Sequence, residues 1–222
     1  AGIVTLAAIG LAGFLVLLSC IPQMGPVLRI YNIPSSSMAP NYPERSYVLV
    51  NLAAYGYSRV SFEWLRLPID GRTPGFGAPA RGDVMVFRSP ADQRQIYIKR
   101  LIGMPGDKVQ LKRGRVYING GALEREALAS RSLSIAGGPP KAAPAWREKA
   151  PGGAAYEIIE LDGDDGYLDN TPEFAVPAGA YFVLGDNRDN SNDSRSEVSK
   201  GGLGFVPDDL LIGKVIGGWG GQ

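Results

Sequence analysis

The sequence predicts a mainly β fold that is preceded by one N-terminal transmembrane helix. Three observations lead to this prediction. Residues 1–21 contain no charged side chain. After Pro22 the chain consists of short runs rich in β-branched and aromatic residues, separated by turn residues. No segment of this second part repeats its apolar residues at the 3.6-residue period of an amphipathic helix.

The first 21 residues are long enough to cross a bilayer as a helix, because about 1.5 Å per residue gives roughly the 30 Å of a hydrocarbon core. A cleaved secretory signal stays open, although the run exceeds the about 7–15-residue apolar core of such signals. A lipoprotein site at Leu17-Leu18-Ser19-Cys20 also stays open; we interpret Cys20 instead as a small apolar residue at the membrane edge. No basic residue precedes the run, so we expect the chain to continue upstream of Ala1, and flanking charge gives no orientation.

The remaining chain divides into one β domain and an interruption. We assign 22–119 and 155–222 to the β domain, with a tight hairpin turn at Arg113-Gly114. Residues 120–154 are dominated by Ala, Gly and Pro and predict an insertion or a long loop. The expected strands are Ser46–Leu52, Asp83–Arg88, Gln95–Ile102, Lys108–Lys112, Arg115–Asn119, Tyr156–Leu161, Ala180–Leu184 and Leu210–Ile216.

The composition excludes several kinds of chemistry. The 222 residues include 23 basic and 22 acidic side chains, one cysteine and no histidine. Ser-His-Asp and Cys-His sites are excluded because their general base is an imidazole, and Cys/His zinc sites are excluded because the ligands are missing. The net charge of +1 argues against nucleic acid as a partner. An enzyme of this composition that works near neutral pH needs a carboxylate, a lysine or a tyrosine to move protons.

Lys99 is the best candidate for such a group, because it stands in the middle of the apolar run Ile96–Ile102. Strand alternation sends Lys99 and Arg100 to opposite faces, so one of the two must face the apolar side. Burial would lower the pKa of a lysine from about 10.4 toward the range of a general base. The alternative is a lysine at a strand edge whose ammonium stays in water.

A calcium site is the competing interpretation of the acidic runs. Asp162, Asp164 and Glu173 match positions 1, 3 and 12 of an EF-hand loop, but Gly166 and Tyr167 at positions 5 and 6 do not fit. Solvated turns explain these carboxylates better. We therefore expect neither a metal nor another cofactor.

Three polar segments carry a family resemblance. IPSSSMAP (Ile33–Pro40), IKRLIGMPGD (Ile98–Asp107) and GDNRDNSNDSR (Gly185–Arg195), in this order, resemble the sequence boxes of type I signal peptidases. RGDVMVF (Arg81–Phe87) is similar to a further box. The resemblance implies a signal-peptidase-like β-fold catalytic domain on the extracytoplasmic side of the cytoplasmic membrane. It also implies a membrane-bound serine endopeptidase that removes signal peptides from exported preproteins through an acyl-enzyme, preferring small residues at −1 and −3. We expect a monomer.

The resemblance also implies roles for single residues. Ser37 is similar to the nucleophile, and Lys99 to the general base. Ser35 matches the serine whose hydroxyl forms the oxyanion hole together with a backbone N–H, assigned to Ser37. Four residues fall where the family builds shallow pockets for small side chains: Ile33, Pro34, Tyr97 and Ile98.

Three residues of the last box have implied supporting roles. Ser191 matches the serine that holds the lysine ammonium in place, and Asp193 with Arg195 matches an ion pair that supports the site.

The sequence departs from the family pattern at two places. Ser36 stands where the family usually has glycine, between the two serines, and residues 196–203 form a short insertion before Gly204-Phe205-Val206-Pro207. Two alternatives therefore stay open. One is a specialised relative that matures conjugative pilin subunits, and the other is a catalytically inactive membrane-tethered domain that binds a partner.

Overall fold

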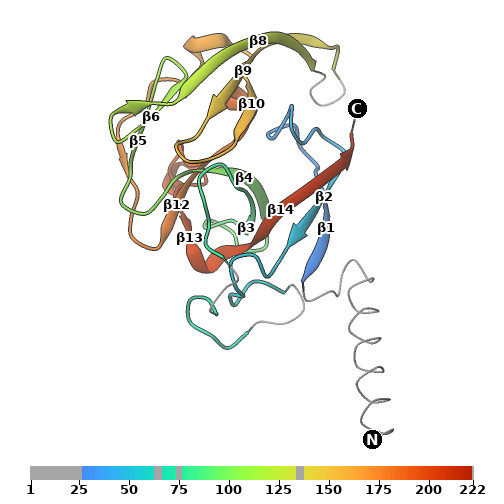
Figure 1. Cartoon of the computed structure of the whole chain (residues 1–222), viewed down its shortest axis with the longest axis vertical. Coiled ribbons are helices and arrows are strands. Elements are labelled where there is room, and N and C mark those ends of the chain that lie inside the picture. The colour runs from blue at the N-terminus through green and yellow to red at the C-terminus, as the bar shows by residue number, and fades with distance from the viewer. Residues whose placement is uncertain (1–26, 63–66, 74–76, 134–137, 222) are drawn as a thin grey trace, which may run out of the picture.

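The computed structural model describes residues 27–62, 67–73, 77–133 and 138–221. Its described part is built from antiparallel strands in three sheets, with short 3-10 turns between some of them (Figure 1). The mainly β prediction is confirmed. The expected anchor at 1–21 lies outside the described residues, and within those that are described no helix has the length and apolar character needed to cross a membrane.

The largest sheet has seven strands in the order β1-β2-β14-β3-β4-β12-β13. The C-terminal β14 lies between β2 and β3, so the last segment of the chain joins its N-terminal strands to its middle ones (Figure 1). The strands are β1 Leu28–Asn32, β2 Ser46–Asn51, β3 Val84–Arg88, β4 Ile96–Gly103, β12 Ala180–Leu184, β13 Val206–Pro207 and β14 Leu211–Gly220.

Strand β4 pairs with a different neighbour along each of its two halves. Strand β3 pairs with it from Val84↔Arg100 to Arg88↔Ile96. Strand β12 pairs with it only from Arg100 to Gly103. In the part of the chain that the structure describes, the first half of β4 therefore has a free backbone edge on the side of β12.

A second sheet has the order β11-β5-β6-β7. The expected hairpin is present, with Lys112 opposite Arg115 and both turn residues, Arg113 and Gly114, at positive φ (49° and 70°). Two left-handed residues in a two-residue turn match the right-handed twist of the strands, and glycine adopts that conformation without strain. The strands are β5 Lys108–Lys112, β6 Arg115–Ile118, β7 Gly121–Ala122 and β11 Phe174–Ala175.

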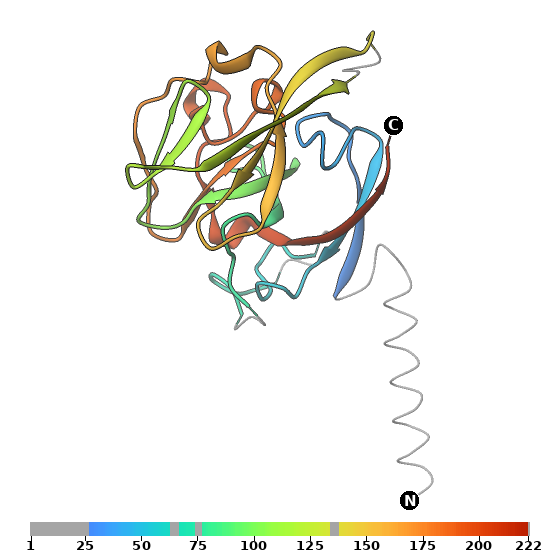
Figure 2. The same cartoon turned by 45° about the horizontal axis from the view of Figure 1, so that its top comes forward.

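The third sheet contains β8 Glu124–Leu133, β9 Lys141–Lys149 and β10 Ala155–Ile159, and Figure 2 shows β8 and β9 as a long ribbon. The prediction of a loop throughout 120–154 is therefore wrong, because β8 and β9 lie in this range. The prediction that the range is an insertion stays a prediction. Composition concealed the strands because the buried positions of β9 are two alanines, Ala143 and Ala145, and a charged residue, Glu148. Four 3-10 turns complete the described chain: η1 Gly163–Asp165, η2 Arg188–Asn190, η3 Val198–Lys200 and η4 Asp208–Leu210.

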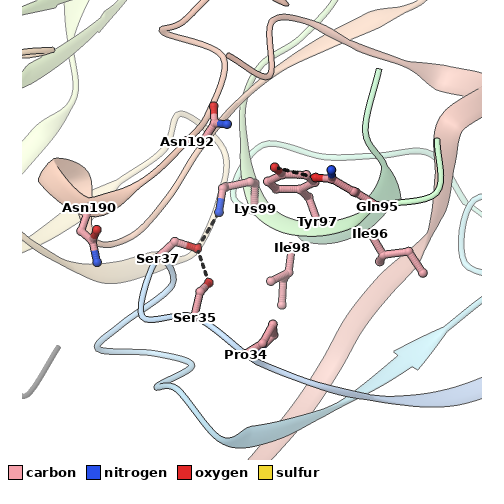
Figure 3. Close-up of a pocket in the computed structure, with 10 residues that line it drawn as sticks. All are labelled: Pro34, Ser35, Ser37, Gln95, Ile96, Tyr97, Ile98, Lys99, Asn190 and Asn192. Atoms are coloured by element: carbon pink, nitrogen blue, oxygen red, sulfur yellow. Dashed lines mark hydrogen bonds between the residues drawn. The ribbon is translucent and has the colours of Figure 1, made fainter. Parts of the chain in front are cut away.

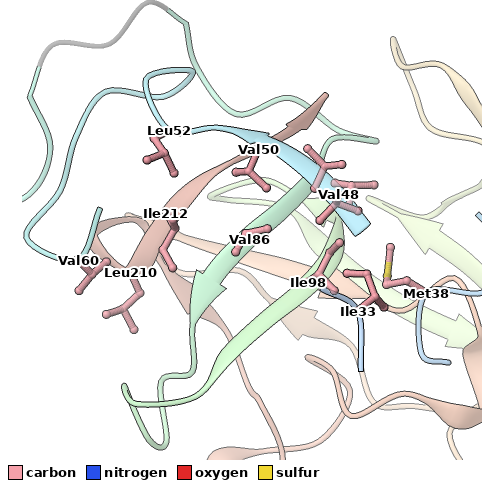
Figure 4. Packing of buried hydrophobic residues seen from close by; sticks show 12 residues of the cluster. Ile33, Met38, Val48, Val50, Leu52, Val60, Val86, Ile98, Leu210 and Ile212 are labelled. Atoms are coloured by element: carbon pink, nitrogen blue, oxygen red, sulfur yellow. The ribbon is translucent and has the colours of Figure 1, made fainter. Parts of the chain in front are cut away.

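One apolar cluster, drawn in Figure 4, connects the large sheet to the loop that follows β1. Met38 lies in that loop, is fully buried and packs in this cluster with Ile33 and Ile98. Burying such a side chain contributes about 1.5–3 kcal/mol. Met38 therefore fixes the loop at the residue directly after Ser37.

Candidate active site

The loop after β1 presents its serines at a turn. The Ala39 N–H donates to the Ser36 carbonyl (3.1 Å), and Met38 forms an isolated bridge with Tyr42. Ser37 is 8% exposed, whereas Ser35 is exposed. The turn thus holds Ser37 against the protein interior and leaves Ser35 in contact with solvent.

Lys99 reaches this turn from the free half of β4. Its Nζ donates a hydrogen bond of 2.6 Å to Ser37 Oγ, although the residue is only 2% exposed (Figure 3). Among the described residues, no carboxylate lies within ion-pair distance of this nitrogen. Burial lowers the pKa of Lys99 to about 8, against the opposing influence of Asp193 and Asp186. A lysine with this pKa is neutral in about a tenth of the molecules at pH 7, far more than an ordinary lysine.

Arg100 points to the other face of β4, as strand alternation predicts, and is also buried. Its guanidinium forms two hydrogen bonds with Asp186 (2.7 and 2.6 Å) and lies 4.1 Å from the ring centroid of Tyr156. The sequence required only one of the two cations to face an apolar side; in the structure both are buried. Arg100 has a carboxylate partner and, being a guanidinium, keeps its proton, whereas the buried Lys99 has no such partner and is poised to lose its proton.

Ser35 borders the same turn. Its hydroxyl oxygen lies 3.2 Å from Ser37 Oγ, and both side chains line one cavity. A hydroxyl at this place can donate toward a negative charge that develops next to Ser37 Oγ.

The segment 185–195 packs against the serine loop from the other side. Ser191 lies over Gly185, where an added Cβ would come within 2.6 Å of the Ser37 carbonyl oxygen. The hydrogen bonds of the described residues include one from Lys99 to Ser37 and none between Lys99 and Ser191. The orienting role expected of Ser191 is thus not seen as a direct contact and stays a prediction.

Asp193 and Arg195, which belong to this segment, form a fully buried ion pair (2.9 Å). Burial alone would raise the pKa of Asp193, but the guanidinium of Arg195 and the backbone N–H of Gly185 outweigh it, so the pKa lies below its ordinary value. Arg195 Nη2 also donates to the carbonyl of Arg188. The pair therefore holds both ends of the segment in one conformation.

A cavity of about 510 Å³ opens over the side chains of Ser37 and Lys99 (Figure 3). An adjoining, mostly apolar hollow of about 240 Å³ is lined by all four residues expected to bind substrate, which are Ile33, Pro34, Tyr97 and Ile98. The larger cavity is lined by Pro34, Ser35, Ser37, Gln95, Ile96, Tyr97, Ile98, Lys99, Asn190 and Asn192.

Comparison with known proteins places this arrangement in a family. The family model described as "Signal peptidase, peptidase S26" matches residues 4–219. The chain belongs to the peptidase S26 family of signal peptidases. The resemblance of the sequence boxes is thereby confirmed.

Relatives in this family are similar over most of the chain. Signal peptidase I of Pseudomonas aeruginosa is 38% identical over 195 residues, which cover 85% of this chain and 63% of the relative. Signal peptidase I of Rickettsia canadensis is also 38% identical, over 85% of this chain and 70% of the relative. The chain thus spans less than two thirds of the length of the Pseudomonas protein. A crystal structure of a signal peptidase I from Enterococcus faecalis is 29% identical, covers 61% of this chain and 95% of that chain, and has a TM-score of 0.35.

Sequence reasoning missed the buried partners of this peptidase S26 site. Arg188, 1% exposed, donates to the fully buried Glu148 (3.0 Å), which lies on β9. Asn187 and Asn190 donate hydrogen bonds to the serine loop. Both asparagines stand in the segment that carries the resemblance, so their polar side chains were a signal, whereas nothing in the range 120–154 marked Glu148.

Proposed function

We propose that this chain is a membrane-bound serine endopeptidase that removes signal peptides from exported preproteins. The single observation that carries the proposal is the hydrogen bond of 2.6 Å between Lys99 Nζ and Ser37 Oγ inside a cavity, with the pKa of the lysine lowered to about 8. Membership in the signal peptidase family and the similarity to signal peptidase I proteins support the same activity.

The proposed reaction begins when neutral Lys99 takes the proton of the Ser37 hydroxyl. Ser37 Oγ then attacks the scissile carbonyl, and the negative oxygen that results is stabilised by the Ser35 hydroxyl and the backbone N–H of Ser37. The Lys99 ammonium gives its proton to the leaving amine, and the C–N bond breaks. An ester between Ser37 and the signal peptide remains.

Water completes the proposed cycle. Lys99, neutral again, takes a proton from a water molecule whose oxygen attacks the ester carbonyl. The tetrahedral intermediate collapses, the Ser37 oxygen leaves and Lys99 returns the proton to it. The products are the free carboxylate of the signal peptide and the free amine of the mature protein.

The free edge of β4 supports an extended substrate. Backbone groups at 96–98 can pair with a peptide strand in the way an added strand pairs with a sheet edge. The adjoining apolar hollow of about 240 Å³, between Ile33 and Ile98, has room for small side chains. This fits the proposed preference for small residues at −1 and −3. Residues 1–21 are proposed to hold the enzyme in the cytoplasmic membrane, with the β domain on its extracytoplasmic side.

The test uses the full chain in detergent and a preprotein with Ala-x-Ala before its cleavage site. We expect cleavage directly after the second Ala, shown by N-terminal sequencing of the product, and none with Ser37→Ala or Lys99→Ala. Lys108→Ala is the matched control, because Lys108 lies exposed on β5 and its ammonium pairs with the exposed Glu173. An inactive wild type would leave a binding domain as the better description, whereas a Ser37→Ala variant that cleaves as well as wild type would show that Ser37 is not the nucleophile.

A further inference from the structure

We propose that Ser36 and Asn190 are positioning residues: the hydrogen bond between their side chains ties the serine loop to the η2 turn and so keeps Ser37 Oγ within reach of Lys99. This inference rests on the proposed function, since it assigns the two residues to the same reaction. Neither side chain contacts the reacting atoms in the proposed mechanism.

Three hydrogen bonds join the serine loop to η2. Asn187 N–H donates to the Ser37 carbonyl (3.1 Å), and Asn187 Nδ2 donates to the Ser36 carbonyl (3.2 Å). Asn190 Nδ2 donates to Ser36 Oγ (2.8 Å), which is the shortest of the three. The first two use backbone acceptors that any residue at position 36 would offer. The third exists only because position 36 carries a hydroxyl.

The η2 turn is a rigid support for this contact. Arg188, the first residue of the turn, forms a buried ion pair with Glu148, and its carbonyl accepts a hydrogen bond from Arg195. The loop is less constrained on its N-terminal side, where Pro34 and Ser35 are exposed. Because the support is fixed and the loop flank is not, the side-chain bond acts on the position of the loop.

The location of Ser36 connects this bond to the chemistry. Ser36 is 5% exposed and directly precedes Ser37, so its side-chain bond holds the residue next to the nucleophile. Without it, the Asn190 amide loses its partner at the cavity wall, and the peptide before Ser37 is held only through its carbonyls. Glycine at position 36, the residue usual in the family, would also add backbone freedom. In this chain, we therefore expect Ser36→Gly to slow the reaction.

The experiment measures kcat and KM on an Ala-x-Ala peptide for wild type, Ser36→Ala, Ser36→Gly, Asn190→Ala and the Ser36→Ala/Asn190→Ala double variant. We expect each single variant to lose about 3- to 10-fold in kcat, the loss typical of one neutral hydrogen bond, with KM within about twofold. The double variant is expected to be no slower than the slower of the two alanine variants, because both remove the same bond. Wild-type kcat in the single variants, or losses that multiply in the double variant, would overturn the proposal.

Ser58→Ala is the matched control. Ser58 is fully buried and its hydroxyl donates to the Leu211 carbonyl (3.2 Å), but it does not line the cavity. We expect Ser58→Ala to lower the melting temperature and leave kcat unchanged. If Ser58→Ala lowered kcat as much as Ser36→Ala, the effect would be one of general stability and the positioning role would be wrong.

A readout without turnover separates this inference from the proposed function. Residue-resolved hydrogen exchange follows the Asn187 N–H, which donates to the Ser37 carbonyl, and the distant Leu123 N–H, which donates to the Val116 carbonyl (2.9 Å), as reference. We expect faster exchange at Asn187 relative to Leu123 in Ser36→Ala and Asn190→Ala, and an unchanged ratio in Ser58→Ala. If wild type cleaves no substrate, the proposed function fails while this ratio still decides whether the bond positions the loop. An unchanged ratio in the first two variants would overturn the proposal.

Discussion

Lys99 Nζ and Ser37 Oγ lie 2.6 Å apart although 62 residues separate them in the sequence. Two features of the fold produce this contact: the free half of β4, which sends the lysine toward the serine loop, and Met38, which anchors that loop in the core. The five predictions below follow from this pair and from the buried charges around it.

Lys99→Arg is expected to reduce cleavage to background. A guanidinium keeps its proton at any pH at which proteins are studied, so it cannot accept the proton of Ser37. Initial rates on an Ala-x-Ala preprotein measure the effect, with circular dichroism to show that the variant is folded. Activity near that of wild type would remove the general-base role from Lys99.

The pH profile of kcat/KM is expected to rise with the deprotonation of Lys99. Burial lowers the pKa of this lysine to about 8, and only the neutral amine can act as base, so the rate increases about tenfold per pH unit below that value and levels off above it. Since the chain has no histidine, no imidazole step is expected near pH 6.5. A rate that is flat between about pH 6 and 9 would contradict this assignment.

Lys99→Met is expected to stabilise the protein. The pKa of Lys99 falls from 10.5 to about 8 on folding, so below about pH 8 the folded state holds the proton at a cost of about 3 kcal/mol. Between about pH 8 and 10.5 the unfolded chain binds more protons, and this cost therefore disappears as the pH rises. Urea unfolding at pH 7 and at pH 10 checks both parts: we expect a higher free energy of unfolding for Lys99→Met at pH 7 and a smaller difference at pH 10. Equal free energies of unfolding for wild type and Lys99→Met at pH 7 would show that burying the charged lysine costs no stability.

Ser35→Ala is expected to slow the reaction without weakening substrate binding. Loss of one oxyanion donor typically reduces kcat by about 10²–10³, whereas the hollow between Ile33 and Ile98 is unchanged. Steady-state kinetics separate kcat from KM. A rise in KM at constant kcat would instead make Ser35 a substrate-binding residue.

Asp193→Asn is expected to destabilise the fold by about 3–5 kcal/mol, because it leaves the guanidinium of Arg195 buried without its carboxylate. The matched control is Glu197→Gln, which breaks an ion pair with Lys200 whose side chains are more than half exposed and should cost less than about 1 kcal/mol. Thermal and urea unfolding of both variants measure the difference. Similar losses in the two variants would mean that the buried pair contributes no more than a surface pair.

The sequence predicted those parts of the molecule whose pattern is local. The strands around Asp83–Arg88 and Gln95–Ile102 are rich in β-branched and aromatic residues, and the Arg113-Gly114 turn has the residues that such a hairpin needs. The ribbon of β8 and β9 was missed because its few buried positions are the small Ala143 and Ala145 and the charged Glu148, so no apolar alternation marks it. Periodicity cannot separate that composition from a loop.

In the candidate site, too, the sequence revealed the residues that stand in a local pattern and not the contacts formed by tertiary folding. Ser37 and Lys99 could be found because each stands in a distinctive segment. The partnership of Glu148 with Arg188 could not, because the residues are 40 positions apart and an ion pair formed by tertiary folding leaves no local pattern. The hydrogen bond from Asn190 to Ser36 joins residues 154 positions apart and was hidden for the same reason.

Adjacent positions on β4 carry two cations with opposite tasks, Lys99 toward the cavity and Arg100 toward Asp186. A shift of β4 by one residue against β3 that moved Arg100 to the place of Lys99 would move Leu101 to the place of Arg100. The serine would then face a guanidinium that never gives up its proton, and the carboxylate of Asp186 would face an apolar side chain. Strand registration is thus itself a condition for catalysis, and a one-residue insertion or deletion in the β3–β4 hairpin could abolish activity while leaving every catalytic side chain in the sequence.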